Sequence, residues 1–288
     1  MNGLSDPAVI RSVLTKAGFS FKKSLGQNFL TDPTVCPRMA CEAAADGETF
    51  ALEIGPGAGV LTNELADRFD SVLAIELDER LRPVLAETLA DKSNVEVIFG
   101  DAMKLDLAAL IKEKAQGKKV SVCANLPYYI TSPLIMGLLE KKLPISSITV
   151  MVQKEAAERL CAEVGSREAG AVTAAVAYYS EASMLFDVSR SSFMPQPDVD
   201  STVIRLRVRE VPPVEVADEK AFFAYVKAAF GQRRKTMVNS LSSLGGFAKD
   251  TVVSALEANG LSSAVRSEAL TLCELANVFN TLYISERK

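Results

Sequence analysis

The stretch "LEIGPGAGVLT" at residues 52–62 joins a short apolar run to a segment with helical spacing of its apolar residues. Glycines at 55, 57 and 59 let the backbone turn sharply and let a ligand approach the main chain closely. A dinucleotide-binding loop, G-x-G-x-x-G, needs a third glycine where Thr62 stands, so that fingerprint fails. The acidic Glu53 would repel a pyrophosphate and attract a cation, which favours a phosphate-free nucleoside ligand. The alternative is a purely structural turn.

Short apolar runs and helical patterns alternate on both sides of this loop. Strands are expected at 50–54, 71–77, 95–99, 119–126 and 146–153, with helices at 32–45, 60–68, 78–90, 106–116, 132–141 and 153–163. This alternation predicts an α/β fold with a doubly wound parallel sheet. A further helix at 171–180 and two last strands, at 182–189 and 201–209, predict a hairpin at the sheet edge.

The pattern changes again near "VPPVEVADE" at 211–219, which has the composition of a linker. Beyond it, residues 218–288 show only helical patterning with Gly and Asn breaks. We therefore predict two domains, a Rossmann-like domain at 1–210 and a small all-helical domain at 211–288.

Composition excludes several kinds of chemistry. The 288 residues include no histidine, which removes Ser–His and Cys–His catalysis and most zinc sites, and we expect no metal. Five cysteines without a CxxC pair indicate free thiols in a reducing compartment. With no apolar run of about 18 residues and no signal-peptide pattern, a cytoplasmic protein away from membranes is expected. The net charge of −4 argues mildly against nucleic-acid binding, although "KAAFGQRRKTM" at 227–237 is locally basic.

Two carboxylates stand at the ends of successive predicted strands. Glu76 ends the second strand, and Asp101 follows the third in "FGDAM". The carboxyl ends of parallel strands present residues to ligands at one edge of a sheet. A carboxylate at 76 suits both hydroxyls of a ribose, and one at 101 suits the exocyclic amine of adenine. With the glycine loop, these acids predict S-adenosylmethionine as the cofactor.

The fourth strand ends at the same edge in "CANLPYYITSP", residues 123–133. An exocyclic amine of a base is hard to methylate, because its lone pair is delocalised into the ring. The amide oxygen of Asn125 and the carbonyl of Leu126 can accept its two protons and favour a tetrahedral nitrogen. Tyr128 then offers a ring face for a flipped base. The alternative is a strand-end turn with surface aromatics.

Four ordered motifs resemble the KsgA/RsmA family of ribosomal-RNA adenine N6,N6-dimethyltransferases. They are "KSLGQNFLTD" at 23–32, "EIGPGAG" at 53–59, "NLPY" at 125–128 and "FMPQPDVDS" at 193–201. The resemblance spans nearly the whole chain and implies a class I methyltransferase fold. It also implies that the target is two adjacent adenines in the 3′-terminal hairpin loop of small-subunit rRNA.

The resemblance also implies roles for individual residues. Asn28 and Leu30 would close over the cofactor, and Gly55 would approach it. Glu76 would hold its ribose and Asp101 its adenine, and Asn125 would contact it on the methyl-donor side. The target adenine would be sandwiched between Tyr128 and Phe193, with its amine on Asn125 and Leu126.

Basic residues outside this site are candidates for gripping RNA. Lys22 and Lys23 precede "QNFL", and Arg233, Arg234 and Lys235 are expected to open the second helix of the C-terminal domain. For the last cluster we favour phosphate contacts over a solvated surface. Arg205, Arg207 and Arg209 share one face of a strand, and for them both interpretations stand. The expected partner is small-subunit rRNA within the subunit or its precursor, bound by a monomer.

Three alternatives remain. Large-subunit rRNA adenine methyltransferases of the antibiotic-resistance type usually read N-I-P-Y and are strongly basic, whereas this chain has Leu126 and is acidic. DNA adenine methyltransferases more often carry D-P-P-Y. A protein acting mainly as a ribosome-assembly factor is the alternative from a different class, and the intact motifs favour an enzyme.

Overall fold

The computed structural model describes residues 4–19, 28–125, 127 and 130–285. The chain forms two compact units, one made of Met1–Ala157 and Ala182–Val208, the other of Glu158–Glu181 and Arg209–Lys288. The chain passes from the first unit to the second for the last time between Val208 and Arg209, close to the boundary predicted at 210/211. The segment Glu158–Glu181, which we had assigned to the first domain, falls in the second unit.

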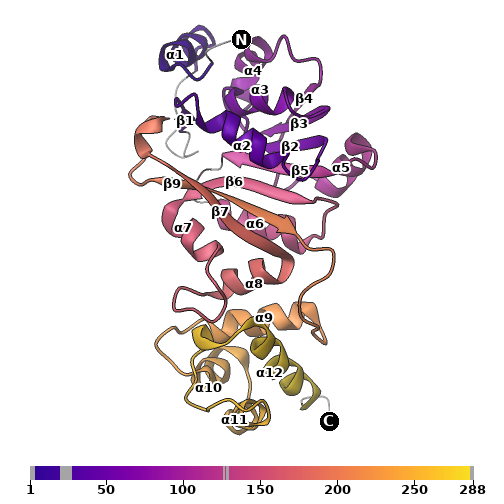
Figure 1. Ribbon diagram of the computed structural model, residues 1–288, viewed down its shortest axis with the longest axis vertical. Coiled ribbons are helices and arrows are strands. Elements are labelled where there is room, and N and C mark those ends of the chain that lie inside the picture. Colours follow the sequence, from indigo (N-terminus) through magenta and orange to yellow (C-terminus); the bar gives the residue numbers. More distant parts are fainter. Residues whose placement is uncertain (1–3, 20–27, 126, 128–129, 286–288) are drawn as a thin grey trace. The chain divides into compact units, whose positions relative to one another are not determined.

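The seven-stranded sheet has the order β4-β3-β2-β5-β6-β9-β7 (Figure 1). Five strands form its parallel part: β2 (Phe50–Ile54), β3 (Ser71–Glu76), β4 (Val95–Phe99), β5 (Val120–Asn125) and β6 (Ser147–Gln153). β9 (Ser201–Val208) pairs antiparallel with β6, and β7 (Ser180–Val188) lies beside it at the edge. The central strands β2 and β5 are almost entirely buried, as expected for parallel strands covered on both faces. The predicted α/β fold is confirmed.

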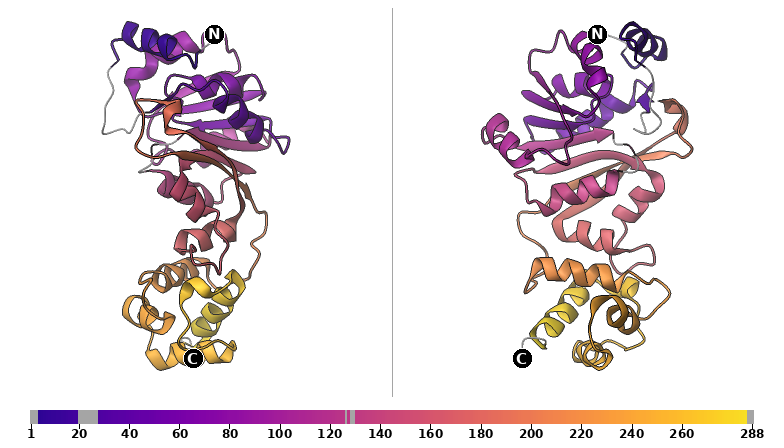
Figure 2. Two further views of the ribbon diagram at one scale, coloured as in Figure 1. Left: turned by 60° about the vertical axis from the view of Figure 1, so that its left-hand side comes forward. Right: turned by 180° about the vertical axis from the view of Figure 1, so that it is seen from behind.

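Helices flank the sheet on both faces (Figure 2). In the first unit they are α1 (Pro7–Lys16), α2 (Val35–Ala43), α3 (Val60–Ala66), α4 (Arg82–Thr88), α5 (Leu107–Ala115) and α6 (Thr131–Glu140). The helix α7 (Lys154–Leu160) follows β6 directly. The second unit contains α8 (Ala171–Tyr179), α9 (Glu219–Ala229), α10 (Met237–Ser240), α11 (Lys249–Ala258) and α12 (Leu272–Ser285). Within it, Phe222, Tyr225 and Phe279 form part of an aromatic core.

One helix was missed, and two others begin more than one residue later than predicted. Of these two, α4 begins at Arg82 instead of 78, because the short 3-10 helix Glu79–Leu81 precedes it. The helix α1 was not predicted, although Asp6 caps it by accepting from the Ala8 amide at 2.7 Å and Pro7 occupies its first turn. The helix α2 begins at Val35 instead of 32, because the Asp32 carboxylate accepts from the amide and hydroxyl of Thr34 and so closes a turn before the helix.

The order of the strands fixes where a ligand can bind. From β2 the chain builds outward through β3 and β4, and then returns to place β5 on the other side of β2. The chain continues from β2 to one side of the sheet through β3 and to the other side at β5. Where the strand order reverses in this way, a crevice forms at the carboxyl ends of the strands, and open α/β sheets bind their ligands there. The site is therefore expected beyond Ile54, Glu76 and Asn125.

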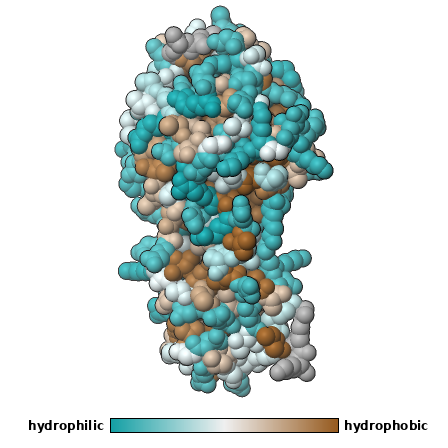
Figure 3. Space-filling model, turned by 45° about the vertical axis from the view of Figure 1, so that its right-hand side comes forward, coloured by the Kyte–Doolittle hydropathy of each residue, from teal (hydrophilic) through white to brown (hydrophobic). Residues whose placement is uncertain are grey.

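In the part of the chain that the structure describes, no helix is long and apolar enough to cross a membrane. Hydrophilic and hydrophobic residues are interspersed on the face seen in Figure 3. Large exposed apolar side chains are few, and two of them, Leu77 and Met103, line the pocket described next.

Candidate active site

The glycine loop leaves β2 in a conformation that only glycine adopts easily. Gly55 and Gly59 have φ angles of 75° and 84°, in the left-handed region. A Cβ atom on Gly59 would lie 2.9 Å from the Thr88 hydroxyl, so this glycine lets α3 and α4 approach. A Cβ atom on Gly55 would meet no atom within 4 Å, because this residue faces open space in a pocket. The glycine at 55 therefore leaves room for a ligand beside the main chain.

Glu76, at the end of β3, is tied to this loop. One carboxylate oxygen accepts from the Gly57 amide at 3.1 Å and the other from the Asp78 amide at 2.8 Å. Burial raises the pKa of Glu76, while these amide donors oppose the shift. Asp78 points to the same pocket and is paired with Arg80, whose Nε lies 2.8 Å from Oδ1. Asp78 was not predicted from the sequence, although it stands two residues beyond Glu76, where the loop continues along the same edge.

Asp101 follows β4 and helps to shape the next part of the pocket. Its carboxylate accepts from the Met103 amide at 3.0 Å and pairs with Lys104 at 3.2 Å. Leu77 and Met103, exposed at 54% and 43%, line the pocket near this carboxylate. Exposed apolar side chains beside an acceptor suit a flat heteroaromatic ring with an exocyclic amine. Neither Leu77 nor Met103 was predicted from the sequence.

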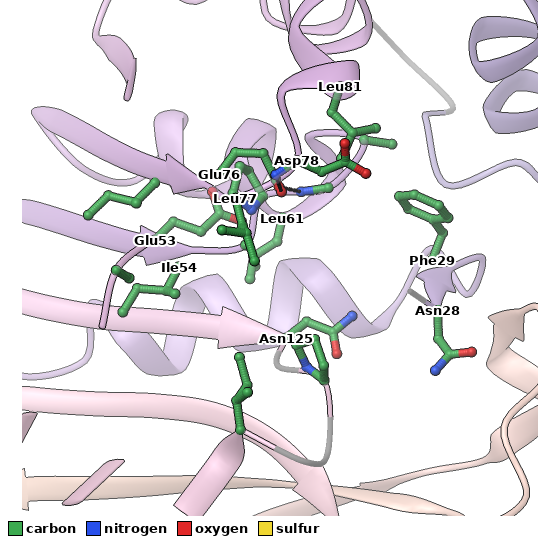
Figure 4. A pocket seen from close by; sticks show the side chains of 18 of the residues that line it. Asn28, Phe29, Glu53, Ile54, Leu61, Glu76, Leu77, Asp78, Leu81 and Asn125 are labelled. Atoms are coloured by element: carbon green, nitrogen blue, oxygen red, sulfur yellow. Dashed lines mark hydrogen bonds between the residues drawn. The ribbon is translucent and has the colours of Figure 1, made fainter. Parts of the chain in front are cut away.

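One pocket brings the predicted residues together (Figure 4). All six residues predicted for the cofactor line it, together with Phe193: Asn28, Leu30, Gly55, Glu76, Asp101 and Asn125. In Figure 4, Asn28 and Phe29 lie across the pocket from Glu76, with Asn125 between the two sides. Leu126, Tyr128, Lys22 and Lys23 lie outside the described residues. The pocket therefore joins the glycine loop to the end of β5, where methyl transfer was predicted.

Two segments far apart in the chain meet at the pocket. β1 (Phe29–Leu30) pairs antiparallel with β8 (Phe193–Met194), with Leu30 opposite Phe193. The pairing continues through the Thr31 amide, which donates to the Ser192 carbonyl at 2.9 Å, and through the Ser192 hydroxyl, which donates to Asp32 at 3.1 Å. Phe193 is only 6% exposed because most of its ring packs into the core. Phe193 also lines the pocket.

Comparison with known proteins matches these features to one family. The family model described as Ribosomal RNA adenine dimethylase matches residues 18–282. The chain belongs to this family. Ribosomal RNA small subunit methyltransferase A of Geobacillus thermodenitrificans is 47% identical over 97% of this chain and 97% of its own length. Its counterpart in Oceanobacillus iheyensis is 45% identical over 99% of this chain and 98% of its own length.

Solved structures agree with this assignment. A dimethyladenosine transferase from Plasmodium falciparum has a TM-score of 0.71 and 26% identity, over 90% of this chain and 97% of its own. The 23S rRNA methyltransferase ErmE has a TM-score of 0.68 and 28% identity, over 88% of this chain and 99% of its own. The fold is thus that of class I rRNA methyltransferases, as predicted.

S-adenosylmethionine is the methyl donor of this rRNA adenine dimethylase, and the pocket suits it. Among the described residues that line the pocket, four carry a carboxyl group (Glu53, Glu76, Asp78 and Asp101) and none is lysine or arginine. Such a lining disfavours phosphates and favours a cationic nucleoside. The open space beside Gly55 leaves room for it.

The basic residues of this dimethylase divide into two kinds. Arg205, only 3% exposed, and Arg207 both pair with Asp46, and Arg209 pairs with Glu181 at 2.9 Å. These strand arginines form ion pairs within their own units. The three basic residues at 233–235 are exposed, and they lie in the turn before α10 instead of opening that helix, which begins at Met237.

Proposed function

We propose that this enzyme transfers methyl groups from S-adenosylmethionine to N6 of two adjacent adenines in the 3′-terminal hairpin loop of 16S rRNA. The observation that carries the proposal is the position of Asn125. It stands at the end of β5 and lines the same pocket as the carboxylates at the ends of β3 and β4. Relatives 45–47% identical over nearly the full chain are named for the small subunit, whereas the similarity to the 23S enzyme is 28%.

On the cofactor side, residues of the pocket would hold each part of the ligand. Glu76 would accept from the ribose hydroxyls, and Asp101 from the exocyclic amine, with the adenine ring against Leu77 and Met103. Asn28 and Leu30 would close over it from β1. When bound, S-adenosylmethionine supplies an electrophilic methyl group.

On the target side, the end of β5 would activate the adenine amine. The Asn125 amide oxygen and the Leu126 carbonyl accept the two N–H protons, which draws the nitrogen lone pair out of the ring and toward the methyl group. Tyr128 and the accessible part of Phe193 hold the flipped base by stacking. The amine is neutral before attack, so no base is required to activate it. One proton leaves to water after transfer, which is compatible with a chain without histidine.

RNA would be gripped by the exposed turn at 233–235. The Arg233 guanidinium donates to the Arg167 carbonyl at 2.8 Å, so this turn lies beside the loop that follows α7, where Arg167 is also exposed. Arginines from two loops of one unit thus form a basic surface suited to phosphates. We further propose that the enzyme acts as a cytoplasmic monomer on the small subunit or its precursor, where it also aids subunit assembly.

The test is incubation of the full chain with labelled S-adenosylmethionine and ribosomal subunits that lack the modification. Small subunits should acquire N6,N6-dimethyladenosine at two adjacent positions, and large subunits should remain unlabelled. Labelling of large subunits alone would show that the chain has the specificity of the antibiotic-resistance enzymes. Tight binding to small subunits without any transfer would show an assembly factor in place of an enzyme.

A further inference from the structure

Glu53 is a buried acid on the wall of the pocket that the mechanism above does not use. It is the fourth residue of β2 and is 1% exposed. Its Oε2 atom is buried and, among the described residues, has only the Thr62 hydroxyl near it, which does not form a hydrogen bond of normal geometry. A buried carboxyl oxygen without a donor is costly unless something else compensates it. The position of Glu53 on the pocket wall indicates that the compensation comes from a ligand.

The other carboxylates of the pocket are already satisfied within the protein. Glu76 accepts from two backbone amides, Asp78 is paired with Arg80, and Asp101 accepts from the Met103 amide and contacts Lys104. Among the described acids that line the pocket, Glu53 is therefore the one with an unused, fully buried acceptor.

Among the residues that the structure describes, no cation acts on Glu53 to balance it. Cys123 faces it in register on β5, Cys36 is near it on α2, and Glu76 stands on the neighbouring β3. Burial raises the pKa of both thiols, so they stay neutral. Burial also raises the pKa of Glu53 to about 8; the Thr62 hydroxyl opposes this rise, and the negative charge of Glu76 adds to it. Near neutral pH the free pocket therefore holds Glu53 mostly protonated, and a bound cation would draw it into the ionised form.

We propose that Glu53 distinguishes the methyl donor from its demethylated product by charge. S-adenosylmethionine carries a sulfonium, whereas S-adenosylhomocysteine has a neutral thioether at the same place and is otherwise the same molecule. The carboxyl group of Glu53 releases a proton to solvent when the sulfonium ligand binds, and the carboxylate stabilises that charge. Once the methyl group has left, the carboxylate has lost its partner, takes the proton back and no longer favours the ligand. The proposal rests on S-adenosylmethionine as the donor and adds a device for product release.

The experiment is calorimetry of the full chain with three ligands in two buffers of different ionisation enthalpy at pH 7. The ligands are S-adenosylmethionine, S-adenosylhomocysteine, and sinefungin, which carries a protonated amine in place of the methylsulfonium. The two cationic ligands should release more protons than S-adenosylhomocysteine. Glu53→Gln should abolish this difference and lower the affinity ratio of S-adenosylmethionine to S-adenosylhomocysteine about tenfold, as expected for charges several ångströms apart in a partly buried site.

Glu48→Gln is the matched control. Glu48 is also buried, but it accepts from the Asp46 amide and from the hydroxyls of Ser146 and Ser147, and it does not line the pocket. This variant should keep both the proton release and the affinity ratio of the wild type. If Glu53→Gln does not fold, the wild type alone still tests the proposal. Its affinity for the cationic ligands relative to S-adenosylhomocysteine should rise between pH 6 and 8.

Two outcomes would overturn the proposal. Equal proton release with all three ligands would show that Glu53 does not sense the sulfonium charge, and an unchanged affinity ratio in Glu53→Gln would show the same. Both leave the proposed function intact as long as S-adenosylmethionine binds. Failure of the wild type to bind S-adenosylmethionine would instead contradict the proposed function itself.

Discussion

Replacing Glu76 separates the contact by which it braces the glycine loop from its proposed role in holding the ligand. The wild-type carboxylate accepts from the amides of Gly57 and Asp78. A hydrogen bond to a charged group contributes about 1.5–3 kcal/mol, so Glu76→Ala removes up to about 6 kcal/mol of gross interaction. Burial of the charge, which raises the pKa of Glu76, offsets much of this, and water entering from the pocket can reach both amides. We expect the net loss of unfolding free energy to be about 2 kcal/mol.

Ligand binding should suffer more than folding does. Glu76→Ala should leave two ribose hydroxyls without their charged acceptor. The affinity for S-adenosylhomocysteine should therefore fall about 100-fold, which corresponds to roughly 2.7 kcal/mol. Urea unfolding followed by circular dichroism gives the stability, and calorimetry gives the affinity. Glu48→Gln again serves as the control, because it perturbs a buried acid with its own donors and should leave the affinity within about threefold of the wild type.

The pattern of results decides which role is real. A loss of stability with unchanged affinity would mean that Glu76 only braces the loop, and the ribose contact would have to be dropped. A loss of affinity with unchanged stability would mean that the two amides find water without cost. If Glu76→Ala changed neither quantity, the hydrogen-bond argument as a whole would be refuted.

Three further predictions concern other parts of the mechanism. Asn125→Ala should lower the rate of single-turnover methylation of small subunits at least about 100-fold and leave the fold intact. Tyr128→Phe should be tolerated, whereas Tyr128→Ala should lose roughly 1–3 kcal/mol of stacking energy. A Tyr128→Phe enzyme as inactive as Tyr128→Ala would refute stacking. Replacing the three basic residues at 233–235 should flatten the salt dependence of RNA binding without changing cofactor affinity, and an unaltered salt slope would mark them as solvated surface. The raised pKa of Glu53, about 8 against 4.5 for the free side chain, gives stability that is complete below about pH 4.5 and is lost as the pH rises through 8. Urea unfolding of the ligand-free protein should therefore show a decline of at most a few kcal/mol between pH 5 and 8, which Glu53→Gln removes.

The sequence predicted the central strands well because they are buried on both faces. Residues 50–54 form the central strand β2 with the predicted bounds, and β3, β5 and β6 match their predicted ranges to within one residue at each end. The edge strand β4 also has its predicted bounds, although it is only partly buried. The helix α1 was missed for a different reason. Its packing surface is a second apolar cluster made with α4, and residues of this cluster such as Leu81 and Val84 are far away in the sequence. Local spacing alone does not show such a partner.

The same reasoning explains which site residues the sequence could indicate. The acids at 76 and 101 follow strands whose parallel pairing brings their ends to one edge, so sequence position already implies proximity. The partner of Arg205 was not predictable in this way, because Asp46 lies 159 positions earlier and meets it only through the antiparallel strand β9. The pairing of Leu30 with Phe193 also depends on a two-stranded sheet too short to leave a pattern in the sequence.

An acidic pocket in an enzyme that acts on RNA has a physical consequence. Three carboxyl groups besides the mostly protonated Glu53 line the pocket, and this acidic lining disfavours phosphates, so it would keep the RNA backbone out of the cavity. A flipped adenine carries no charge and is not subject to this repulsion. The pocket can therefore admit the base and exclude the backbone, while the exposed basic turn at 233–235 is proposed to contact the phosphates. The net charge of −4 is thus compatible with RNA binding, because specificity at the pocket requires acids and affinity requires only a local basic surface.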